Sequence, residues 1–323
     1  MKKLLTAADY LEGILRGNSV TLARAITLIE SNNPEHSSLA QEILLKCIPH
    51  SGKSIRIGIT GVPGVGKSSF IEALGKTLTK KNKKIAVLAI DPSSGRSKGS
   101  ILGDKTRMET LSADKNAFIR PSPTSGTLGG VALKTRETIV LCEAAGYEII
   151  FIETVGVGQS EISVSSMVDF FLLLVLAGAG DELQGIKKGI MEMADAIAVT
   201  KSDGDNVKPT IKAKAEYINA LHLLPPSASG WIPKVTSCSS VTGEGVKDIW
   251  KMVEQYVAFT NENGWFVKQR SEQNLYWMHE TVSEELRRRF YSDQQVKEKI
   301  KNLEQQVKDG KLSSFEAARL LLS

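Results

Sequence analysis

The chain has 323 residues, of which 41% are apolar and 24% are charged, values that are ordinary for a soluble globular protein. Its formal net charge of +5 is spread thinly, without a basic stripe interleaved with aromatic residues, which argues against a nucleic-acid-binding protein. No apolar run approaches the roughly 20 residues that a membrane-spanning helix needs, so we expect no membrane segment.

Cysteine usage and the first residues indicate the compartment. Cys47, Cys142 and Cys238 lie far apart and form no C-x-x-C pair, which is typical of reduced thiols that bind no metal. Asp9 and Glu12 interrupt the apolar stretch that a signal peptide needs, and acidic residues are unusual in mitochondrial transit peptides. We therefore expect a cytoplasmic protein.

Residues 1–53 are expected to form a helical N-terminal extension. The amphipathic pattern predicts a first helix over Ala7–Arg16, and Ser19 is a candidate cap for a second helix. The run Asn32–Pro34 should end that helix. A third helix is predicted over Ser38–Ile48.

Strand and helix patterns alternate over residues 54–260. The apolar runs are short and continuous, as in strands that helices cover on both faces. This alternation predicts an α/β fold with a mostly parallel sheet. The expected strands are Ile55–Thr60, Ile85–Ile90, Ala117–Arg120, Glu148–Glu153, Phe170–Leu176, Ala196–Thr200 and Val235–Ser237.

Residues 261–323 return to a helical pattern. Apolar residues recur at helical spacing with charged residues between them, so the stripe either packs on the parent domain or pairs with a second copy of the chain. We favour pairing, because the segment is long and lies beyond the sheet, and we expect a helical dimerisation arm. The stripe comprises Met278, Val282, Leu286 and Phe290, followed by Val296, Ile300, Leu303 and Val307.

The most informative motif lies between the first expected strand and the helical pattern that follows it. The segment from Gly61 to Ser68 matches G-x-x-x-x-G-K-[ST] in full, and in this context it predicts a P-loop NTPase, a three-layer sandwich. Glycines let the backbone wrap around an anion, and the helix N-terminus adds positive charge there. Lys67 should reach the outer phosphates, and Ser68 should offer its hydroxyl to Mg²⁺. The candidate phosphate-binding residues are Gly61, Val62, Pro63, Gly64, Val65, Gly66, Lys67, Ser68 and Ser69.

A second motif, Thr200 to Asp203, follows the sixth expected strand and is a candidate reader of the base. The Asp203 carboxylate can accept hydrogen bonds from two adjacent donors of guanine, which adenine lacks on that edge. Lys201 can lay its stem along the base. Thr200 stands where the usual pattern has Asn, and its hydroxyl can bond either to the base N7 or to the phosphate loop. Small residues at the end of the last strand can bring N–H groups to the guanine O6, and these are Ser237, Cys238 and Ser239.

Acidic residues at strand ends are candidates for a metal site. Glu153 ends the fourth strand ahead of Gly156, in a turn similar to D-x-x-G with Glu in place of Asp. Asp91 follows the second strand, and Asp104 lies in the loop after it. Carboxylates suit Mg²⁺, although each acid could instead cap a helix or form a turn. The candidate metal ligands are therefore Ser68, Asp91, Asp104 and Glu153, and the Gly156 N–H could sense the γ-phosphate.

One catalytic residue is missing from its usual place. Small signalling GTPases have Gln directly after D-x-x-G to orient the attacking water, whereas Val157 follows Gly156 here. We therefore expect slow hydrolysis by the isolated protein. The glycine-rich segment 177–189 could bring in Gln184 and Lys187 to orient water and offset phosphate charge, although a solvated loop explains this segment equally well. The candidate catalytic residues are Lys67, Glu153, Gln184 and Lys187.

Six segments carry a likeness to a known family: Gly61–Ser68, Asp91–Ser94, Gly99–Met108, Glu153–Glu161, Gly178–Lys188 and Gln273–Met278. Together they resemble the MeaB/ArgK-type GTPases, the G-protein chaperones of methylmalonyl-CoA mutase. The resemblance covers nearly the whole chain, and the combination is specific although the phosphate loop alone is not. It implies GTP or GDP bound with Mg²⁺, hydrolysis of GTP stimulated by a partner, and a homodimer formed through the C-terminal arm.

The resemblance also implies a partner and residue roles. Members of this family gate the transfer of adenosylcobalamin from an adenosyltransferase to a cobalamin-dependent acyl-CoA mutase, and they protect the mutase from inactivation. The γ-phosphate and Mg²⁺ would hold switch segments that hydrolysis releases. By this resemblance Asp91 and Asp104 fall in a first switch, Gly156–Glu161 in a second, and Asp181, Gln184 and Lys187 in a third that responds to the mutase.

Three other functions remain as alternatives. A metal-insertion GTPase for nickel enzymes has a similar G domain, but the four histidines are scattered and there is no C-x-x-C motif to hold a metal. A kinase tied to amino-acid transport, an older label for this family, would need a protein phosphoacceptor. A binding module that never hydrolyses nucleotide is disfavoured by the full set of acidic metal-ligand candidates.

Overall fold

The computed structural model describes residues 5–31, 33–90, 108–121, 128–154, 160–178 and 188–322. The chain divides into two compact units, Met1–Gln273 and Asn274–Ser323. Within the described ranges, no helix is long and apolar enough to cross a membrane.

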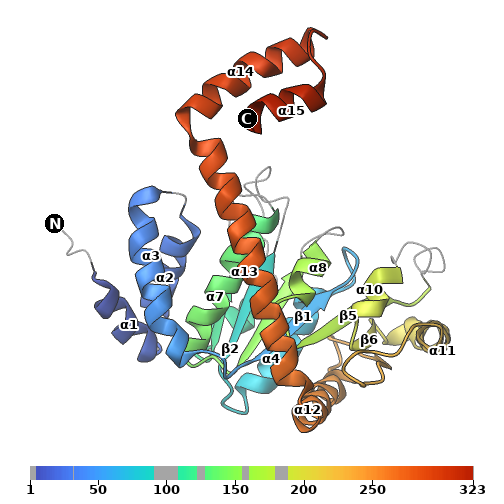
Figure 1. The fold of residues 1–323 in the computed structure, drawn as a ribbon. Coiled ribbons are helices and arrows are strands. Elements are labelled where there is room, and N and C mark those ends of the chain that lie inside the picture. Colours follow the sequence, from blue (N-terminus) through green and yellow to red (C-terminus); the bar gives the residue numbers. More distant parts are fainter. Residues whose placement is uncertain are drawn as a thin grey trace. The chain divides into compact units, whose positions relative to one another are not determined.

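A seven-stranded sheet forms the centre of the first unit (Figure 1). Its strand order is β3-β2-β4-β1-β5-β6-β7. Every pairing between these strands is parallel, so the predicted α/β fold is confirmed. The expected bounds agree with the structure for five strands, whereas the fourth lies one residue further along the chain at both ends and the seventh begins one residue earlier. The strands are β1 (Ile55–Thr60), β2 (Ile85–Ile90), β3 (Ala117–Arg120), β4 (Ile149–Thr154), β5 (Phe170–Leu176), β6 (Ala196–Thr200) and β7 (Lys234–Ser237).

Helices cover both faces of the sheet, which is why the strands are apolar throughout (Figure 1). Alternate side chains of β5 point to opposite faces, so Leu172 and Leu174 enter one core while Leu173 and Val175 enter the other. The first core is covered by α4 (Lys67–Thr79) and α12 (Val246–Glu262), and the second by α10 (Lys188–Met193) and α11 (Val207–His222). The other helices that the structure describes beside the sheet are α6 (Glu109–Ser112), α7 (Leu128–Ala144), α8 (Ser160–Ser165), and the short 3₁₀ turns η1 (Ile48–His50) and η2 (Gly204–Asn206).

Three helices precede the sheet, as expected, but two of their starts differ from the prediction. The second helix begins at Ser19 and is capped by Asn18, whose side chain accepts two backbone hydrogen bonds, so the prediction of Ser19 as the cap was wrong. The third begins at Pro34, four residues before the predicted Ser38, because Asn33 caps it and proline suits the first turn. The helices are α1 (Ala7–Leu15), α2 (Ser19–Glu30) and α3 (Pro34–Cys47).

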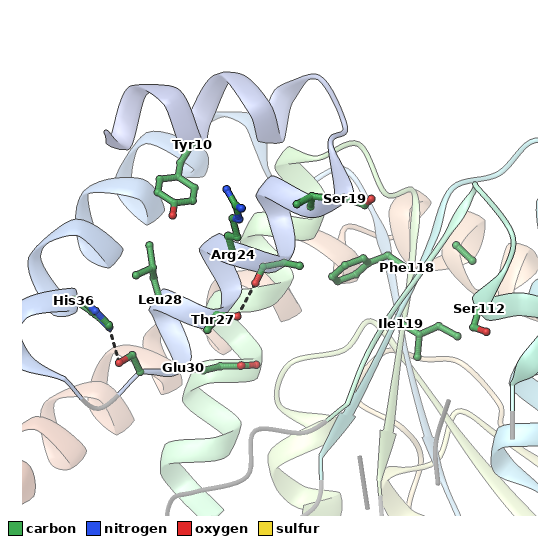
Figure 2. Close-up of a pocket in the computed structure, with 14 residues that line it drawn as sticks. Tyr10, Ser19, Arg24, Thr27, Leu28, Glu30, His36, Ser112, Phe118 and Ile119 are labelled. Atoms are coloured by element: carbon green, nitrogen blue, oxygen red, sulfur yellow. Dashed lines mark hydrogen bonds between the residues drawn. The ribbon is translucent and has the colours of Figure 1, made fainter. Parts of the chain in front are cut away.

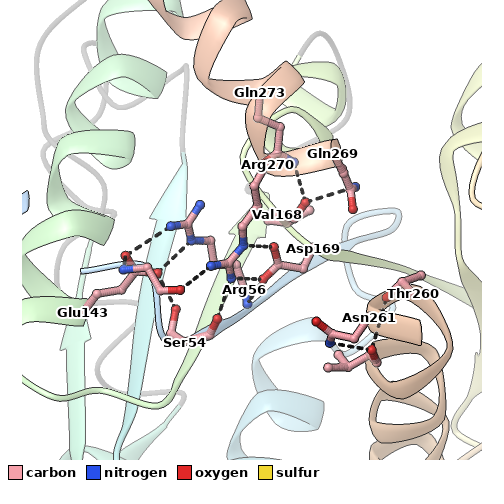
Figure 3. Close-up of polar contacts among 12 residues, drawn as sticks. Ser54, Arg56, Glu143, Val168, Asp169, Thr260, Asn261, Gln269, Arg270 and Gln273 are labelled. Carbon is pink, nitrogen blue, oxygen red and sulfur yellow. Dashed lines mark hydrogen bonds and ion pairs between the residues drawn. The ribbon is translucent and has the colours of Figure 1, made fainter. Parts of the chain in front are cut away.

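A buried ion network fixes the amino ends of the central strands (Figure 3). Arg56 of β1 forms an ion pair with Glu143 of α7 at 2.9 Å. Burial alone would raise the pKa of Glu143, but the Arg56 guanidinium holds this pKa below its ordinary value. The Asp169 carboxylate, just before β5, accepts a hydrogen bond from the Arg56 backbone N–H at 2.8 Å. It also accepts hydrogen bonds from the Arg270 guanidinium at 2.7 Å. Arg270 also donates to Ser54 O at 2.6 Å. The start of α13 (Trp265–Ser292) is therefore tied to β1 and β5.

The second unit consists of the rest of α13 and two shorter helices, α14 (Gln294–Lys308) and α15 (Ser314–Leu322). Leu303 of α14 and Ala317 of α15 are buried, which makes these two helices a packed pair. The α13 part of the predicted stripe is open, since Met278, Val282 and Leu286 are 52%, 52% and 62% exposed. Whether this stripe pairs with a second copy stays a prediction.

Candidate nucleotide-binding site

The glycine loop follows β1, the central strand, and leads into α4. Gly61 has φ +147°, and a Cβ there would lie 2.4 Å from Leu174 O of the neighbouring strand, so only glycine fits at the start of the loop. Gly66 has φ +99° and directly precedes the first residue of α4. The loop thus delivers the N-terminus of a 13-residue helix to the carboxyl edge of the sheet, where its N–H groups and dipole favour an anion.

The Lys67 ammonium lies within this loop. It donates to Gly61 O at 2.7 Å and to Val62 O at 3.3 Å, and the residue is only 8% exposed. A buried cation at the N-terminus of a helix suits the outer phosphates of a nucleotide. Val62, Pro63, Gly64 and Ser69 complete the loop and the first turn of α4.

Two oxygen ligands meet beside the loop. The Ser68 hydroxyl of α4 donates to Glu153 Oε1 at 3.0 Å, and both residues are buried, at 8% and 4% exposure. They are brought together because β4 lies next to β1, with Glu153 in register with Ile59. A hydroxyl and a carboxylate are hard oxygen donors of the kind that Mg²⁺ prefers, so these two residues fit a magnesium site.

The Thr200 hydroxyl holds the glycine loop from the other side. Thr200 is the last residue of β6. Its hydroxyl donates to Val65 O at 2.7 Å and lies 3.2 Å from Val175 O of β5. The sequence predicted that the Thr200 hydroxyl would bond either to the base N7 or to the phosphate loop, and the contact with Val65 O is the second of these. Asn at this place in the usual motif can make a similar bond, so Thr at this position keeps a tie between the loop after β6 and the glycine loop.

The loops after β6 and β7 are joined into one surface. Ser239 donates its hydroxyl to Asp203 Oδ2, and Ser202 N donates to Cys238 O at 3.2 Å. Lys201 has φ +55°, an unusual conformation for a residue with a side chain, and such strain is common at binding sites. Burial raises the pKa of the Cys238 thiol to about 12, so this thiol stays protonated and is not a nucleophile.

The structure brings together most, but not all, of the predicted site. Lys67, Ser68 and Glu153 cluster at the loop, Thr200 contacts the loop, and Asp203 meets Ser239. Six predicted residues lie outside the described residues, namely Asp91, Asp104, Gly156, Asp181, Gln184 and Lys187.

Sequence reasoning missed one buried pair beside the loop. The Thr154 hydroxyl donates to the Thr60 hydroxyl at 3.0 Å, at the carboxyl ends of β4 and β1. The pair links the strand that precedes the glycine loop to the strand that carries Glu153. A threonine ending each of two adjacent apolar strands is the signal that could have revealed it.

Comparison with known proteins identifies the family. Residues 22–295 match the family model described as methylmalonyl-CoA mutase-associated GTPase MeaB. The chain belongs to this family. A probable GTPase of Mycobacterium tuberculosis is 49% identical over 95% of this chain and 91% of its own length. The mouse methylmalonic aciduria type A homolog, a mitochondrial protein, is 47% identical over 96% of this chain and 77% of its own length.

A solved structure supports the fold over the whole chain. The crystal structure of a LAO/AO transport system kinase matches with a TM-score of 0.77 and 35% identity, covering 99% of this chain and 98% of that one. The resemblance expected from the sequence motifs is therefore confirmed, and so is the P-loop fold. As a member of the MeaB family, the protein is a GTPase that hydrolyses GTP to GDP and phosphate.

Proposed function

We propose that this GTPase is a chaperone of a cobalamin-dependent acyl-CoA mutase of the methylmalonyl-CoA mutase type. It would gate the loading of adenosylcobalamin from an adenosyltransferase and protect the mutase from inactivation. The observation that carries the proposal is the match of residues 22–295 to a family described as methylmalonyl-CoA mutase-associated. The name of the mouse relative, methylmalonic aciduria type A homolog, supports the same client.

In this proposal the described loops divide the recognition of GTP between them. Backbone N–H groups from Gly61 to Ser69 and the Lys67 ammonium bind the phosphates. The Asp203 carboxylate accepts from guanine, and its contact with Ser239 orients it for this. Lys201 covers the base, while the backbone at Ser237 and Cys238 approaches O6.

A magnesium ion would be held by Ser68 and Glu153, which meet at 3.0 Å beside the loop, and by Asp91 and Asp104. When bound, the ion supplies positive charge that offsets negative charge on the phosphate oxygens. The chain's own residues then position the substrate: Lys67 neutralises the outer phosphates, and Glu153 is placed to order water near the γ-phosphate.

The client would complete the catalytic site. Gly156 would sense the γ-phosphate through its N–H, and Gln184 and Lys187 would orient the attacking water and offset charge once the client binds. The support is chemical, because no Gln directly follows Gly156 in the sequence.

We further propose three functional segments, 1–53, 54–260 and 261–323, the last a homodimerisation arm. Support comes from the open apolar side chains of α13, since Met278, Val282 and Leu286 are each more than half exposed. We place the protein in the cytoplasm, because its three cysteines are all buried free thiols, as is usual in a reducing compartment.

The decisive experiment is single-turnover GTP hydrolysis with and without a purified cobalamin mutase from the same host. We expect the mutase to raise the rate by at least about tenfold, as partner-supplied groups do in other GTPases. Gln184→Ala should reduce the stimulated rate and leave the unstimulated rate nearly unchanged. An unchanged rate with every cobalamin mutase of the host would remove the proposal's main support, and transfer of labelled phosphate to a protein would favour a transport-linked kinase instead.

A further inference from the structure

A groove of about 960 Å³ lies between the N-terminal helices and one edge of the sheet (Figure 2). Residues from α1, α2, α3, α6 and β3 line it, and none of them belongs to the nucleotide-binding site. Its volume is near the upper end of the roughly 300–1,000 Å³ that ligand sites occupy. The groove is therefore large enough for a ligand, and its lining is separate from the nucleotide-binding site.

One wall of the groove is the outer edge of β3, which pairs with no other strand among the residues that the structure describes and is called the open edge below. The ladder to β2 uses alternate residues of β3, beginning with Asn116 O, which accepts from Ile85 N at 2.8 Å. In a parallel ladder the residues in between turn their backbone groups to the other side. The N–H and C=O of Ile119, and the C=O of Ala117, thus point to the open edge that lines the groove.

The opposite wall is the exposed side of α2, and it is fixed relative to β3. Arg120 at the end of β3 donates to Glu30 Oε1 at 3.1 Å and to Thr27 Oγ1 at 3.3 Å. Because this contact joins helix to strand, the groove is preformed and an occupant need not order its walls. Val20 on α2 is 62% exposed, and Phe118 of β3 lines the groove as well, so both walls offer apolar surface.

The charge of the groove is positive. Glu30 is compensated by its ion pair with Arg120. Arg24 lines the groove, and among the residues that the structure describes it has no hydrogen-bond or ion-pair partner (Figure 2). A carboxylate entering the groove would find this guanidinium available for a bidentate contact.

We propose that this groove binds an extended, acidic segment of a partner protein, which pairs with β3 as an additional strand. Backbone bonds to Ile119 and Ala117 would hold the segment, and its alternate side chains would contact Phe118 and Val20. An Asp or Glu of the segment pairs with Arg24. The proposal gives the N-terminal helices a function in partner recognition, and it does not depend on the client proposed above.

The test begins with a random peptide library displayed on phage and selected on the full-length protein. We expect the enriched peptides to combine β-branched or aromatic residues with Asp or Glu. The enriched peptides are then synthesised with a fluorophore, and their dissociation constants are measured by anisotropy. Failure to enrich any peptide, or enrichment of basic peptides, overturns the proposal.

Variants then locate the contact. Ile119→Pro removes the N–H on the open edge without touching the ladder to β2, and proline is tolerated on edge strands. We expect Ile119→Pro to weaken peptide binding at least about tenfold, which is the effect of losing one backbone hydrogen bond. Ile119→Ala keeps the N–H and should change binding by less than about threefold. Arg24→Glu should also weaken binding at least about tenfold. Arg16→Glu should not, because Arg16 is the exposed residue that follows α1 and it does not line the groove.

A second measurement serves if Ile119→Pro does not fold. Amide hydrogen exchange of the wild-type protein should slow at Ile119 when the peptide binds and stay unchanged at Phe118, whose N–H already faces β2. Equal binding to the Arg24→Glu variant, or peptide binding without protection of Ile119, would show that the segment does not add to β3.

Discussion

Thr200 shows how one hydroxyl can couple two loops. It donates to Val65 O in the glycine loop, so the loop after β6 also supports the glycine loop. Thr200→Val should lower the free energy of unfolding by about 1–2 kcal/mol, because Val65 O loses its buried partner, and GTP affinity should fall with it. Thr200→Ser keeps the hydroxyl and should stay close to wild type. Denaturant unfolding and calorimetry with GTP measure both effects, and identical behaviour of the Val and Ser variants would contradict this role.

Asp195, just before β6, gives the fold a pH dependence. Desolvation raises the pKa of its carboxyl to about 7, although the hydrogen bond from Phe171 N at 2.8 Å opposes the rise. The folded state therefore binds more protons than the unfolded state between about pH 4 and 7, and stability falls as the pH rises through this range.

Asp195→Asn removes this titration and keeps an acceptor for Phe171 N. Relative to wild type, the variant should gain stability between pH 4 and pH 8, by at most about 4 kcal/mol. Urea unfolding at both pH values measures the change. A difference between variant and wild type that does not depend on pH would show that Asp195 does not titrate in this range.

Between elements, the turn from β1 into α4 requires glycine at position 61, because a larger residue there would collide with a neighbouring strand. Gly61 and Gly64 both have positive φ, but only at Gly61 would a Cβ meet another backbone atom, Leu174 O at 2.4 Å. Gly61→Ala should therefore displace the loop and abolish measurable GTP binding, whereas Gly64→Ala carries only the left-handed strain of about 1–2 kcal/mol. Thermal unfolding and GTP titration of the pair test this. Equal losses in the two variants would mean that the contact with β5 is unimportant.

The strands and the glycine loop could be predicted because their signals are local. A strand buried on both faces is a short apolar run, and the loop has a fixed spacing of glycine, lysine and serine. The start of α3 was harder, because Asn33 and Pro34 serve as cap and first turn yet also resemble a helix end. The partner of the Thr200 hydroxyl could not be predicted. It depends on the distance between the loop after β6 and the glycine loop, and no local sequence pattern reports that distance.

At the scale of the whole molecule, contacts far apart in sequence escape such reasoning altogether. Arg270 and Asp169 are separated by 101 residues, and neither lies in a motif. Their pairing joins the start of α13 to the amino ends of β1 and β5 (Figure 3). The same holds for the groove beside β3, since an open strand edge is a property of the sheet order.

Arg270→Met tests the weight of this connection. Asp169 would remain buried with one cation fewer, so the free energy of unfolding should fall by about 3–5 kcal/mol. Arg319→Met removes an exposed pair with Glu316 and should cost less than about 1 kcal/mol. Guanidinium unfolding of both variants gives the comparison, and similar losses would mean that the buried network contributes no more than a surface pair.

We expect nucleotide selectivity to depend on recognition of guanine by Asp203, beside a phosphate loop built from main-chain N–H groups. Isothermal titration of the purified protein with GTP and with ATP, in the presence of Mg²⁺, tests it most directly. We expect GTP to bind at least about 100-fold more tightly, and Asp203→Ala to remove most of that preference, because a carboxylate that pairs with two guanine donors would lose both partners with adenine. ATP binding as tight as GTP binding, or no binding of either nucleotide, would contradict the account.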